Sequence, residues 1–474
     1  MRKRQTARLL CGAVCAALLC GCTQAGMLAP AAPLPPAQTA VAAQLNESGA
    51  ALPAGRLTLF TFTAAGKNEA VVLAGDHLLY RAAAGKTVHL LADAAKGAAS
   101  CYAVSQGTED TGAAVYDAAG GEIYFCAANE VPLLTAGSWL LVGTPENGVC
   151  TAARWLRMGT GEEKAGPAGI AARAQNVRAG AAPGGGFWLD TADGGVLFFD
   201  ADAEQTAAAA GQKLVGFLGG MACLQAEGAD ALTTLDPATG AAGPALTSGR
   251  TLYSAGWEGY QILAGEDGST VYDADGKIVA AFSGWCRFYN GHIAILSRTA
   301  PVQTQAGEVR TASGKLTLVL PDGTVVPASA ASWNTRTGAA ALAQGAGVTV
   351  YGRGGRVLYS VKKIAAKTRF YLLADGTLAV EKTDRSGVAL YSHRGKMYAS
   401  SEYVAFAPAA ASTTPVAYRA DGRCALLLDG GATTVGELDA CRPLSDTRAV
   451  VRQGAMVGLI DAGGRWVWSL DTSA

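Results

Sequence analysis

Ser360 and Lys363 stand at the S-x-x-K spacing, in which a lysine can activate a serine nucleophile. That chemistry needs the serine at the start of a helix. Residues 357–359 (Val-Leu-Tyr) instead predict a strand that continues through Ser360. The chain also has no G-x-S-x-G motif. We therefore expect a strand at this place and no acyl-transfer site.

A second motif, Ala-Gly-Lys-Thr at residues 84–87, has the ending of a phosphate-binding loop. The full motif needs another glycine at position 80, where Tyr80 stands. A glycine between two strand-like segments is typical of a tight turn. We expect a hairpin turn at Gly85 and no phosphate site.

Metal ligands are equally hard to assemble from this sequence. Asp273 and Asp275 lie in an Asp-Ala-Asp-Gly segment like the start of a calcium loop, but no glutamate follows at the last ligand position. We interpret these carboxylates as caps of a turn. No two histidines have metal-ligand spacing on one element. We predict no catalytic residue, no cofactor and no metal site; the four histidines are His77, His89, His292 and His393.

The chain has 11 cysteines, four of which lie within its first 22 residues. No C-x₂-C pair occurs among the others, so a zinc site is not predicted. Two pairs, Cys101 with Cys126 and Cys424 with Cys441, are near enough in the sequence to bridge neighbouring strands. We favour the alternative that most of these cysteines are small, buried apolar residues. They are Cys101, Cys126, Cys150, Cys223, Cys286, Cys424 and Cys441.

The eight tryptophans suggest a different function, namely the binding of a sugar or a peptide. Aromatic side chains on loops can stack on sugars or hold a peptide. We expect most of them to pack in the core. Trp285 and Trp333 lie near irregular segments and are our candidates for a binding face. The others are Trp139, Trp155, Trp188, Trp257, Trp466 and Trp468.

The elements that would position these residues are strands. After residue 55 one unit recurs: an apolar strand, a short turn, a second strand, a D-x-x-G-type turn and a third strand, as in residues 260–279. Asp caps such a turn and Gly supplies its positive φ. A spacing of about 40 residues between such turns predicts β-propeller blades. The expected turn glycines are Gly85, Gly120, Gly240, Gly276, Gly323, Gly355, Gly395, Gly430 and Gly463.

Two copies resemble known propeller repeats. Residues 234–240 (Thr-Leu-Asp-Pro-Ala-Thr-Gly) are similar to the blade turn of PQQ-like repeats, and residues 458–466 resemble WG-type repeats without the Trp-Gly pair itself. The resemblance implies an all-β propeller over residues 55–474. We count ten or eleven units, whereas a ring usually holds about four to eight blades. One ring of about seven or eight blades, or two packed rings, would fit, with residues 301–310 as a junction or a long loop.

The N-terminus points to a membrane. Four basic residues precede an apolar run over residues 9–19, which is shorter than the about 20 residues of a spanning helix. Leu19-Cys20-Gly21-Cys22 resembles the lipobox of bacterial lipoproteins, which implies a signal peptide at 1–21 and a lipid on Cys22. A short membrane anchor, or cleavage at another small residue, are the alternatives. Residues 22–54, rich in Pro and Ala, predict a disordered tether.

Charge sets limits on the partners. Lys plus Arg and Asp plus Glu are 38 each, so the chain offers no overall basic field for nucleic acid or for anionic lipid headgroups. We therefore predict a lipid-anchored protein of the cell membrane, facing outside the cytoplasm. Its propeller would bind or scaffold a protein or a cell-envelope glycan. The alternatives are a carbohydrate-active lyase or hydrolase on a propeller, and an envelope signal-sensing subunit.

Overall fold

The computed structural model describes most of the chain after residue 56. Cys22, the predicted signal peptide and nearly all of the predicted tether lie outside the described residues. The described residues are 46–47, 57–64, 67–82, 85–106, 112–246, 249–255, 257–297, 301–303, 308–311, 316–335, 337–364, 368–373, 376–381, 387–392, 394–399, 403–407, 416–428, 433–445, 448–461 and 464–472.

Antiparallel strands account for nearly all regular structure, and the chain divides into two compact units, Asn46–Leu246 and Thr247–Ala474. The described part of the first unit has two short 3-10 helices, Ala174–Asn176 and Pro183–Gly185. Its strands are β1 (Asn46–Glu47), β2 (Leu57–Ala64), β3 (Lys67–Ala74), β4 (His77–Ala82), β5 (Lys86–Asp93), β6 (Ala98–Gln106), β7 (Ala113–Asp117), β8 (Glu122–Cys126), β9 (Val131–Ala136), β10 (Trp139–Glu146), β11 (Val149–Arg157), β12 (Glu163–Ala165), β13 (Ile170–Ala171), β14 (Ala179–Ala181), β15 (Phe187–Asp190), β16 (Val196–Phe199), β17 (Gln205–Ala209), β18 (Gln212–Leu218), β19 (Met221–Ala226) and β20 (Thr233–Leu235).

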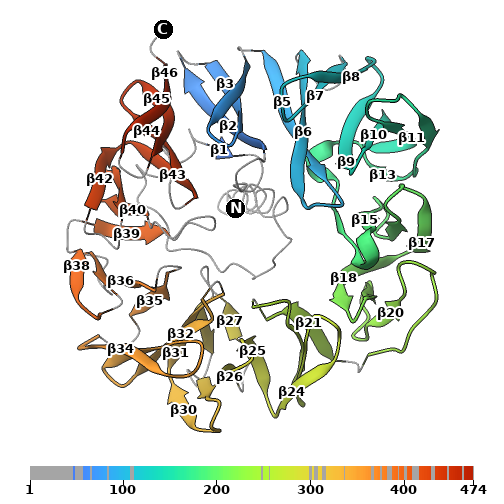
Figure 1. The fold of residues 1–474 in the computed structure, drawn as a ribbon. Coiled ribbons are helices and arrows are strands. Elements are labelled where there is room, and N and C mark those ends of the chain that lie inside the picture. Colours follow the sequence, from blue (N-terminus) through green and yellow to red (C-terminus); the bar gives the residue numbers. More distant parts are fainter. Residues whose placement is uncertain are drawn as a thin grey trace, which may run out of the picture. The chain divides into compact units, whose positions relative to one another are not determined.

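The second unit is built in the same way (Figure 1). Its strands are β21 (Arg250–Ser254), β22 (Gln261–Gly265), β23 (Gly268–Tyr272), β24 (Ile278–Phe282), β25 (Trp285–Tyr289), β26 (Ala294–Ser297), β27 (Pro301–Gln303), β28 (Glu308–Thr311), β29 (Leu316–Val319), β30 (Val325–Ala328), β31 (Ala330–Asn334), β32 (Ala339–Gln344), β33 (Gly347–Tyr351), β34 (Val357–Lys362), β35 (Arg369–Leu372), β36 (Leu378–Glu381), β37 (Val388–Tyr391), β38 (Met397–Ala399), β39 (Tyr403–Ala407), β40 (Val416–Arg419), β41 (Cys424–Leu428), β42 (Thr433–Leu438), β43 (Ala440–Ser445), β44 (Arg448–Gln453), β45 (Met456–Asp461) and β46 (Trp466–Asp471).

Each sheet is a small meander in which strands that follow one another in the chain pair with one another. The described strands form five such meanders in the first unit and six in the second. Two of the five share one sheet, because β5 and β9 pair in parallel at Asp93 and Thr135. This is the blade structure of an all-β propeller fold, as the sequence predicts. The number of meanders agrees with the ten or eleven units in the sequence and exceeds the seven or eight expected of a single ring.

Residues 301–310, expected to be a junction or a long loop, form most of a hairpin. Strands β27 and β28 pair with each other and lie between β26 and β29 in the sequence, whereas β26 and β29 pair directly in their sheet. Strand β28 then pairs with β31 of the next sheet. The boundary between the two compact units lies elsewhere, between Leu246 and Thr247.

The predicted turn has one recurring geometry. At Asp273 the backbone N–H donates to the carbonyl of Lys277 (3.0 Å), and the N–H of Gly276 donates to the carbonyl of Asp273 (3.0 Å). The carboxylate of Asp273 accepts from the N–H of Lys277 (2.8 Å), and Gly276 has φ +79°. The Asp273 carboxylate therefore caps the turn, as expected, and Asp275 lies within the turn and donates its backbone N–H to that carboxylate (3.1 Å). In the last sheet the positive-φ position is Gly464, while Gly463 and Gly430 lie outside the described residues.

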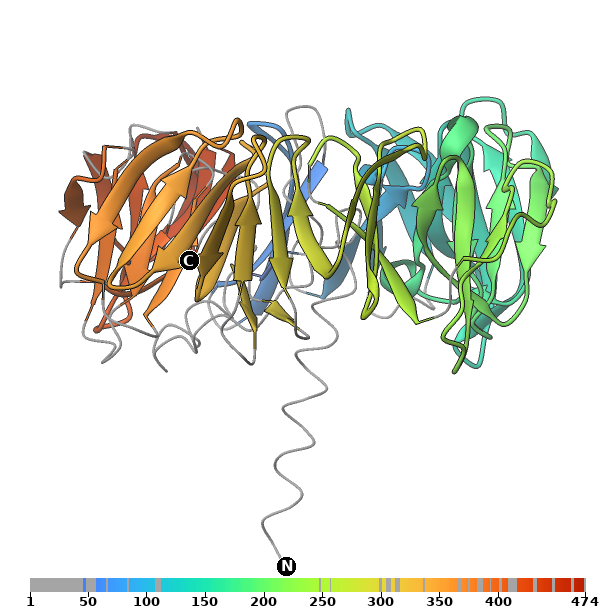
Figure 2. The same ribbon diagram turned by 90° about the horizontal axis from the view of Figure 1, so that it is seen from below.

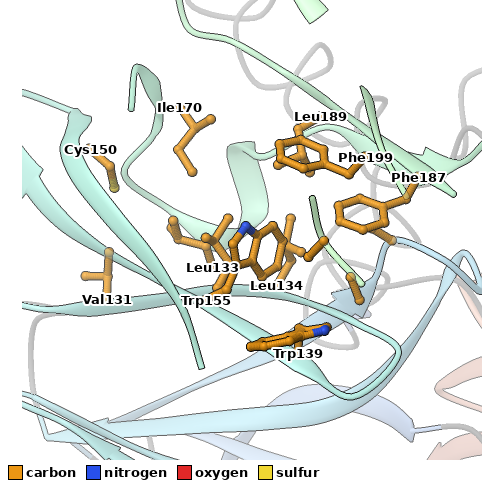
Figure 3. Close-up of a cluster of buried hydrophobic side chains, with 14 of the residues drawn as sticks. Val131, Leu133, Leu134, Trp139, Cys150, Trp155, Ile170, Phe187, Leu189 and Phe199 are labelled. Atoms are coloured by element: carbon orange, nitrogen blue, oxygen red, sulfur yellow. The ribbon is translucent and has the colours of Figure 1, made fainter. Parts of the chain in front are cut away.

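The core lies between successive sheets (Figure 3). In the first unit the Trp155 indole, fully buried on β11, meets the rings of Phe187 and Phe199 edge-on at 5.6 and 5.9 Å between ring centroids. These two phenylalanines come from β15 and β16 and stack on each other at 5.0 Å. Such alternating apolar side chains on the strands remove both faces of a meander from water.

All seven cysteines of the described chain are free, and all but the half-buried Cys441 are buried. This confirms the interpretation of most of them as small core residues; neither proposed bridge forms. Burial raises the pKa of the Cys126 and Cys286 thiols to about 12. These thiols are therefore neutral and shielded.

Candidate functional site

The motifs first tested for chemistry are structural elements. Ser360 lies on β34, where its exposed hydroxyl donates to Thr349 at 3.1 Å. Gly85 forms a turn with φ +90°, and Lys86 begins β5. No group of three or more potential metal ligands gathers among the described residues. No helix within them is long and apolar enough to span a membrane.

The histidines lie apart from one another. His77 and His292 are exposed, and His393 lies outside the described residues. His89 lies on β5 and lines, with Ser105 and six apolar residues, a cavity of about 20 Å³. That volume holds about one water molecule. The cavity is therefore too small for a substrate.

The two candidate tryptophans have different environments. Trp333, on β31, is only 6 % exposed, and its ring lies 5.8 Å from that of Phe288 in an apolar cluster. The structure thus makes it a core residue, because both faces of its sheet are covered. Trp285 begins β25 and is half-buried. Of the two, Trp285 alone is open to solvent, and the pair does not form a common face.

Beside Trp285 the structure places Arg287, which the sequence did not single out. The guanidinium carbon of Arg287 lies 4.6 Å from the centroid of the Trp285 ring and 5.2 Å from that of Tyr253 on β21. A cation held over two aromatic rings is stabilised by both ring quadrupoles. Arg287 and Tyr253 are also half-buried, so the three side chains form a cluster at the surface, here called the Arg287 clamp.

A β-bulge on β25 sets the direction of the Arg287 side chain. On β25, Cys286 pairs with Leu296 and Phe288 pairs with Ile295, so Arg287 has no partner on β26. A bulged residue leaves the ladder and its side chain is redirected, which is common beside functional sites. The buried hydroxyl of Ser269 donates to the carbonyl of Gly284 (2.6 Å) and accepts from the N–H of Cys286 (2.8 Å). Ser269 lies on β23, so it ties the start of β25 to the neighbouring sheet.

The electrostatics of the clamp are unusual for an arginine. Burial lowers the pKa of Arg287 and raises the pKa of Tyr253 well above its ordinary value. Among the described residues no carboxylate pairs with Arg287; Tyr253 and Cys286 are the groups that act on it. Arg353 offers the contrast, because it stacks on Trp257 at 5.1 Å and also meets Glu258 at 3.3 Å. A partly desolvated guanidinium without a counter-charge is an anion-binding group.

One signal in the sequence could have identified Arg287. Residues 285–289 (Trp-Cys-Arg-Phe-Tyr) read as a strand with one charged residue among apolar ones. A cation inside an apolar strand needs either a partner or a function. The bulge itself has no such signal, because no Gly or Pro marks it.

Comparisons with known proteins identify no family. No protein-family model matches the sequence, and no curated protein does so. Several solved structures match at low similarity. BamB from Moraxella catarrhalis has 12 % identity and a TM-score of 0.29, over 84 % of this chain and 96 % of its own. Kluyveromyces lactis Hsv2 has 10 % and 0.27, over 60 % and 93 %. A eukaryotic initiation factor has 14 % and 0.34, over 68 % and 82 %.

Proposed function

We propose that this chain is an extracytoplasmic, lipid-anchored binding module, and that the Arg287 clamp holds an anionic group of a cell-envelope glycan. The observation that carries the proposal is the half-buried guanidinium between Trp285 and Tyr253, with no carboxylate partner among the described residues. A ligand carboxylate or phosphate would supply the missing charge and accept a pair of N–H groups from the planar fork.

Binding is favoured over catalysis by the chemistry of the group itself. A guanidinium donates hydrogen bonds but remains protonated at ordinary pH, so it serves poorly as a general acid or base. Two rings and a tied strand fix its position before the ligand arrives. Such preorganisation lowers the entropy lost on binding.

The anchor rests on the sequence alone. The lipobox-like Leu19-Cys20-Gly21-Cys22 supports a lipid on Cys22, and the Pro- and Ala-rich residues 22–54 would give the sheets reach from the membrane. Two or more acyl chains suffice for stable anchoring. Replacement Cys22→Ala should move the protein out of the membrane fraction. Unchanged retention of that variant, with no acyl group found by mass spectrometry of the wild type, would refute the anchor.

Ligand binding can be tested with oligogalacturonate, an acidic sugar probe, against the neutral maltohexaose. We expect the wild type to bind only the acidic probe in calorimetry, and Arg287→Met to bind about tenfold or more weakly, since a charge-assisted hydrogen bond contributes about 1.5–3 kcal/mol. Arg353→Met is the matched control, because it removes a stacked arginine that already has Glu258. Equal affinities of wild type and Arg287→Met would refute the site. Binding of an acidic peptide alone would indicate a protein partner instead.

A further inference from the structure

The second unit repeats one arrangement of basic and apolar side chains. Among the described turns between the third and fourth strands of its sheets, four end on a basic residue, and the fourth strand then begins with exposed apolar side chains. In the first of these turns, at Lys277 before Ile278 and Val279, the exposed Asp275 precedes the lysine by two residues. The other three turns have no carboxylate at that position. The basic residues that close these three turns are Arg356, Lys396 and Arg465, joined by Arg353 and Arg394 within the turns. The apolar residues that follow are Val357 (49 % exposed), Leu358 (50 %), Met397 (52 %), Trp466 (38 %) and Val467 (40 %).

The geometry of the turn explains why a basic residue is followed by exposed apolar residues in each of these sheets. The N–H of Gly352 donates to the carbonyl of Arg356 (2.9 Å), and the N–H of Gly355 donates to that of Gly352 (2.9 Å). The equivalent bonds at Ser392 and Lys396 are 2.9 and 2.7 Å, and at Asp461 and Arg465 both are 2.9 Å. The basic residue therefore closes each turn, and the next residue starts the outermost strand. With no further strand beyond it, that strand leaves its side chains open.

All three turns lie at the same edge of the second unit. In a meander of four antiparallel strands the chain enters and leaves at the same edge, because the number of strands is even. Short connections from Ala399 to Tyr403 and from Leu438 to Ala440 then start the next sheet at that edge. The turns between third and fourth strands consequently face the opposite edge throughout. Figure 2 shows the strands of these sheets (orange to red) side by side.

The corresponding turns in the first two sheets of the second unit, and those in the first unit, differ in charge from the turns at Arg356, Lys396 and Arg465. The corresponding turn of the sheet β21–β24 exposes both Asp275 and Lys277, and that of the sheet β25–β30 exposes Asp322 and no basic residue. In three corresponding turns of the first unit an exposed glutamate stands at this place: Glu162 and Glu204 close their turns, and Glu122 begins the strand directly after its turn. The net charge of zero thus conceals a local basic surface. The expectation of no basic field for lipid headgroups rests on the net charge of the whole chain, which does not describe the local charge at this edge.

We propose that the turns at Arg356, Lys396 and Arg465, with the apolar residues after them, form a membrane-facing edge that rests on anionic lipid headgroups. Neither Arg356 nor Lys396 forms an ion pair within the described chain, and the Arg465 side chain, although 3.2 Å from Asp461, is 85 % exposed. Cations placed directly beside exposed aliphatic side chains and a tryptophan match the two layers of a bilayer interface, where headgroup charge lies next to the acyl boundary.

This edge would add a second membrane contact to the proposed lipid anchor. A lipid on Cys22 alone would leave the sheets free to reorient at the end of the tether. The test should therefore use the chain from residue 23 onward, which lacks both Cys22 and the apolar run over residues 9–19, so that neither can contribute to membrane contact. Flotation with vesicles of phosphatidylglycerol and phosphatidylcholine in equal parts measures the contact. We expect this protein to float with those vesicles, to do so less as salt is raised, and to stay behind with phosphatidylcholine alone.

Adding Arg356→Gln and Lys396→Gln should lower the partition coefficient about 30-fold, since each cation near an anionic surface contributes about 1 kcal/mol. Met397→Ser should also weaken flotation. The matched control is Lys362→Gln with Lys363→Gln, which removes the same charge at the far end of β34. We expect the control to float like its parent, with all variants melting alike because these side chains are exposed.

Several results would overturn the proposal. Failure of the parent to float, equal flotation with phosphatidylcholine alone, or equal losses in the Arg356/Lys396 variant and the control would each exclude this edge. A parent that sediments as a dimer and becomes monomeric with Arg356→Gln and Lys396→Gln would assign the surface to a second copy of the chain. None of these results depends on whether Cys22 carries a lipid, so the two claims can fail separately.

Discussion

Two adjacent glycines, Gly354 and Gly355, should respond in opposite directions when alanine replaces them. Gly355 has φ +81°, in the left-handed region. A Cβ added there would lie 2.8 Å from the Cδ of Pro321 and 3.2 Å from a methyl group of Leu320, which belong to the corresponding turn of the preceding sheet. Gly354 has no positive φ, and a Cβ there would meet open space. The two positions therefore differ in both strain and room.

The magnitudes follow from these two differences. An L-residue in the left-handed region costs about 1–2 kcal/mol. Overlap with a rigid proline ring forces a shift of one turn against the other, at a cost of about 1–3 kcal/mol. We expect Gly355→Ala to lower the free energy of unfolding by about 2–5 kcal/mol. Gly354→Ala should raise it by about 0.4–1 kcal/mol, because alanine restricts the unfolded chain.

Urea denaturation followed by tryptophan fluorescence measures both changes, and circular dichroism verifies that each variant keeps its strands. The two variants are distinguished by the sign of the change in the free energy of unfolding. An error in the extrapolation to zero urea affects both variants alike. If the two substitutions shift the midpoint by the same amount in the same direction, the turn does not have the geometry described. If Gly355→Ala is neutral, the contact between the two turns is absent in solution.

Three further predictions concern the fold. Gly276→Val should lower the free energy of unfolding by about 2 kcal/mol or more, because a β-branched residue resists φ +79°; an unchanged urea midpoint would contradict that turn. Trp155→Ala should cost about 3–5 kcal/mol by emptying the space against Phe187, as calorimetry would show, and a loss below about 1 kcal/mol would contradict the packing. Stability should fall as pH rises from about 8.5 to 12, since unfolded thiols release their protons near 8.5 and the folded Cys126 and Cys286 hold theirs to about 12; midpoints in reductant that stay constant over this range would contradict it.

The repeated unit allowed the fold to be predicted from the sequence. A cap at Asp273, a glycine at Gly276 and alternating apolar residues on both sides predict a hairpin with its mechanism, and the structure has that hairpin. The number of units was also readable. What the sequence could not indicate is how neighbouring meanders join, since one parallel pair at Asp93 and Thr135 merges two of them. Such a pair depends on tertiary packing and has no local signal.

The residues of the proposed binding site were predicted only in part, and the reason lies in the register of the strands. Trp285 lies on β25 and Trp333 on β31, and each strand pairs with the next strand of the chain, yet Trp285 is half-buried and Trp333 belongs to the core. A shift of one residue in a strand exchanges its two faces. The bulge at Arg287 makes such a shift within β25, and no residue type announces it. The lone cation in an apolar strand was the available signal, whereas its aromatic partner Tyr253 comes from another sheet.

The same turn that builds the fold also leaves positions free for function. In copies such as the turn at Asp273 the first residue caps the turn, and the fourth must tolerate positive φ, so both are constrained by folding. The residue that closes the turn and the one that begins the outer strand carry no such constraint, because their side chains face solvent. These are the positions that hold Glu122 in the first unit and Arg356 with Val357 in the second. Charge can therefore differ between edges without any change in stability, which is why we place the membrane contact there rather than in the core strands.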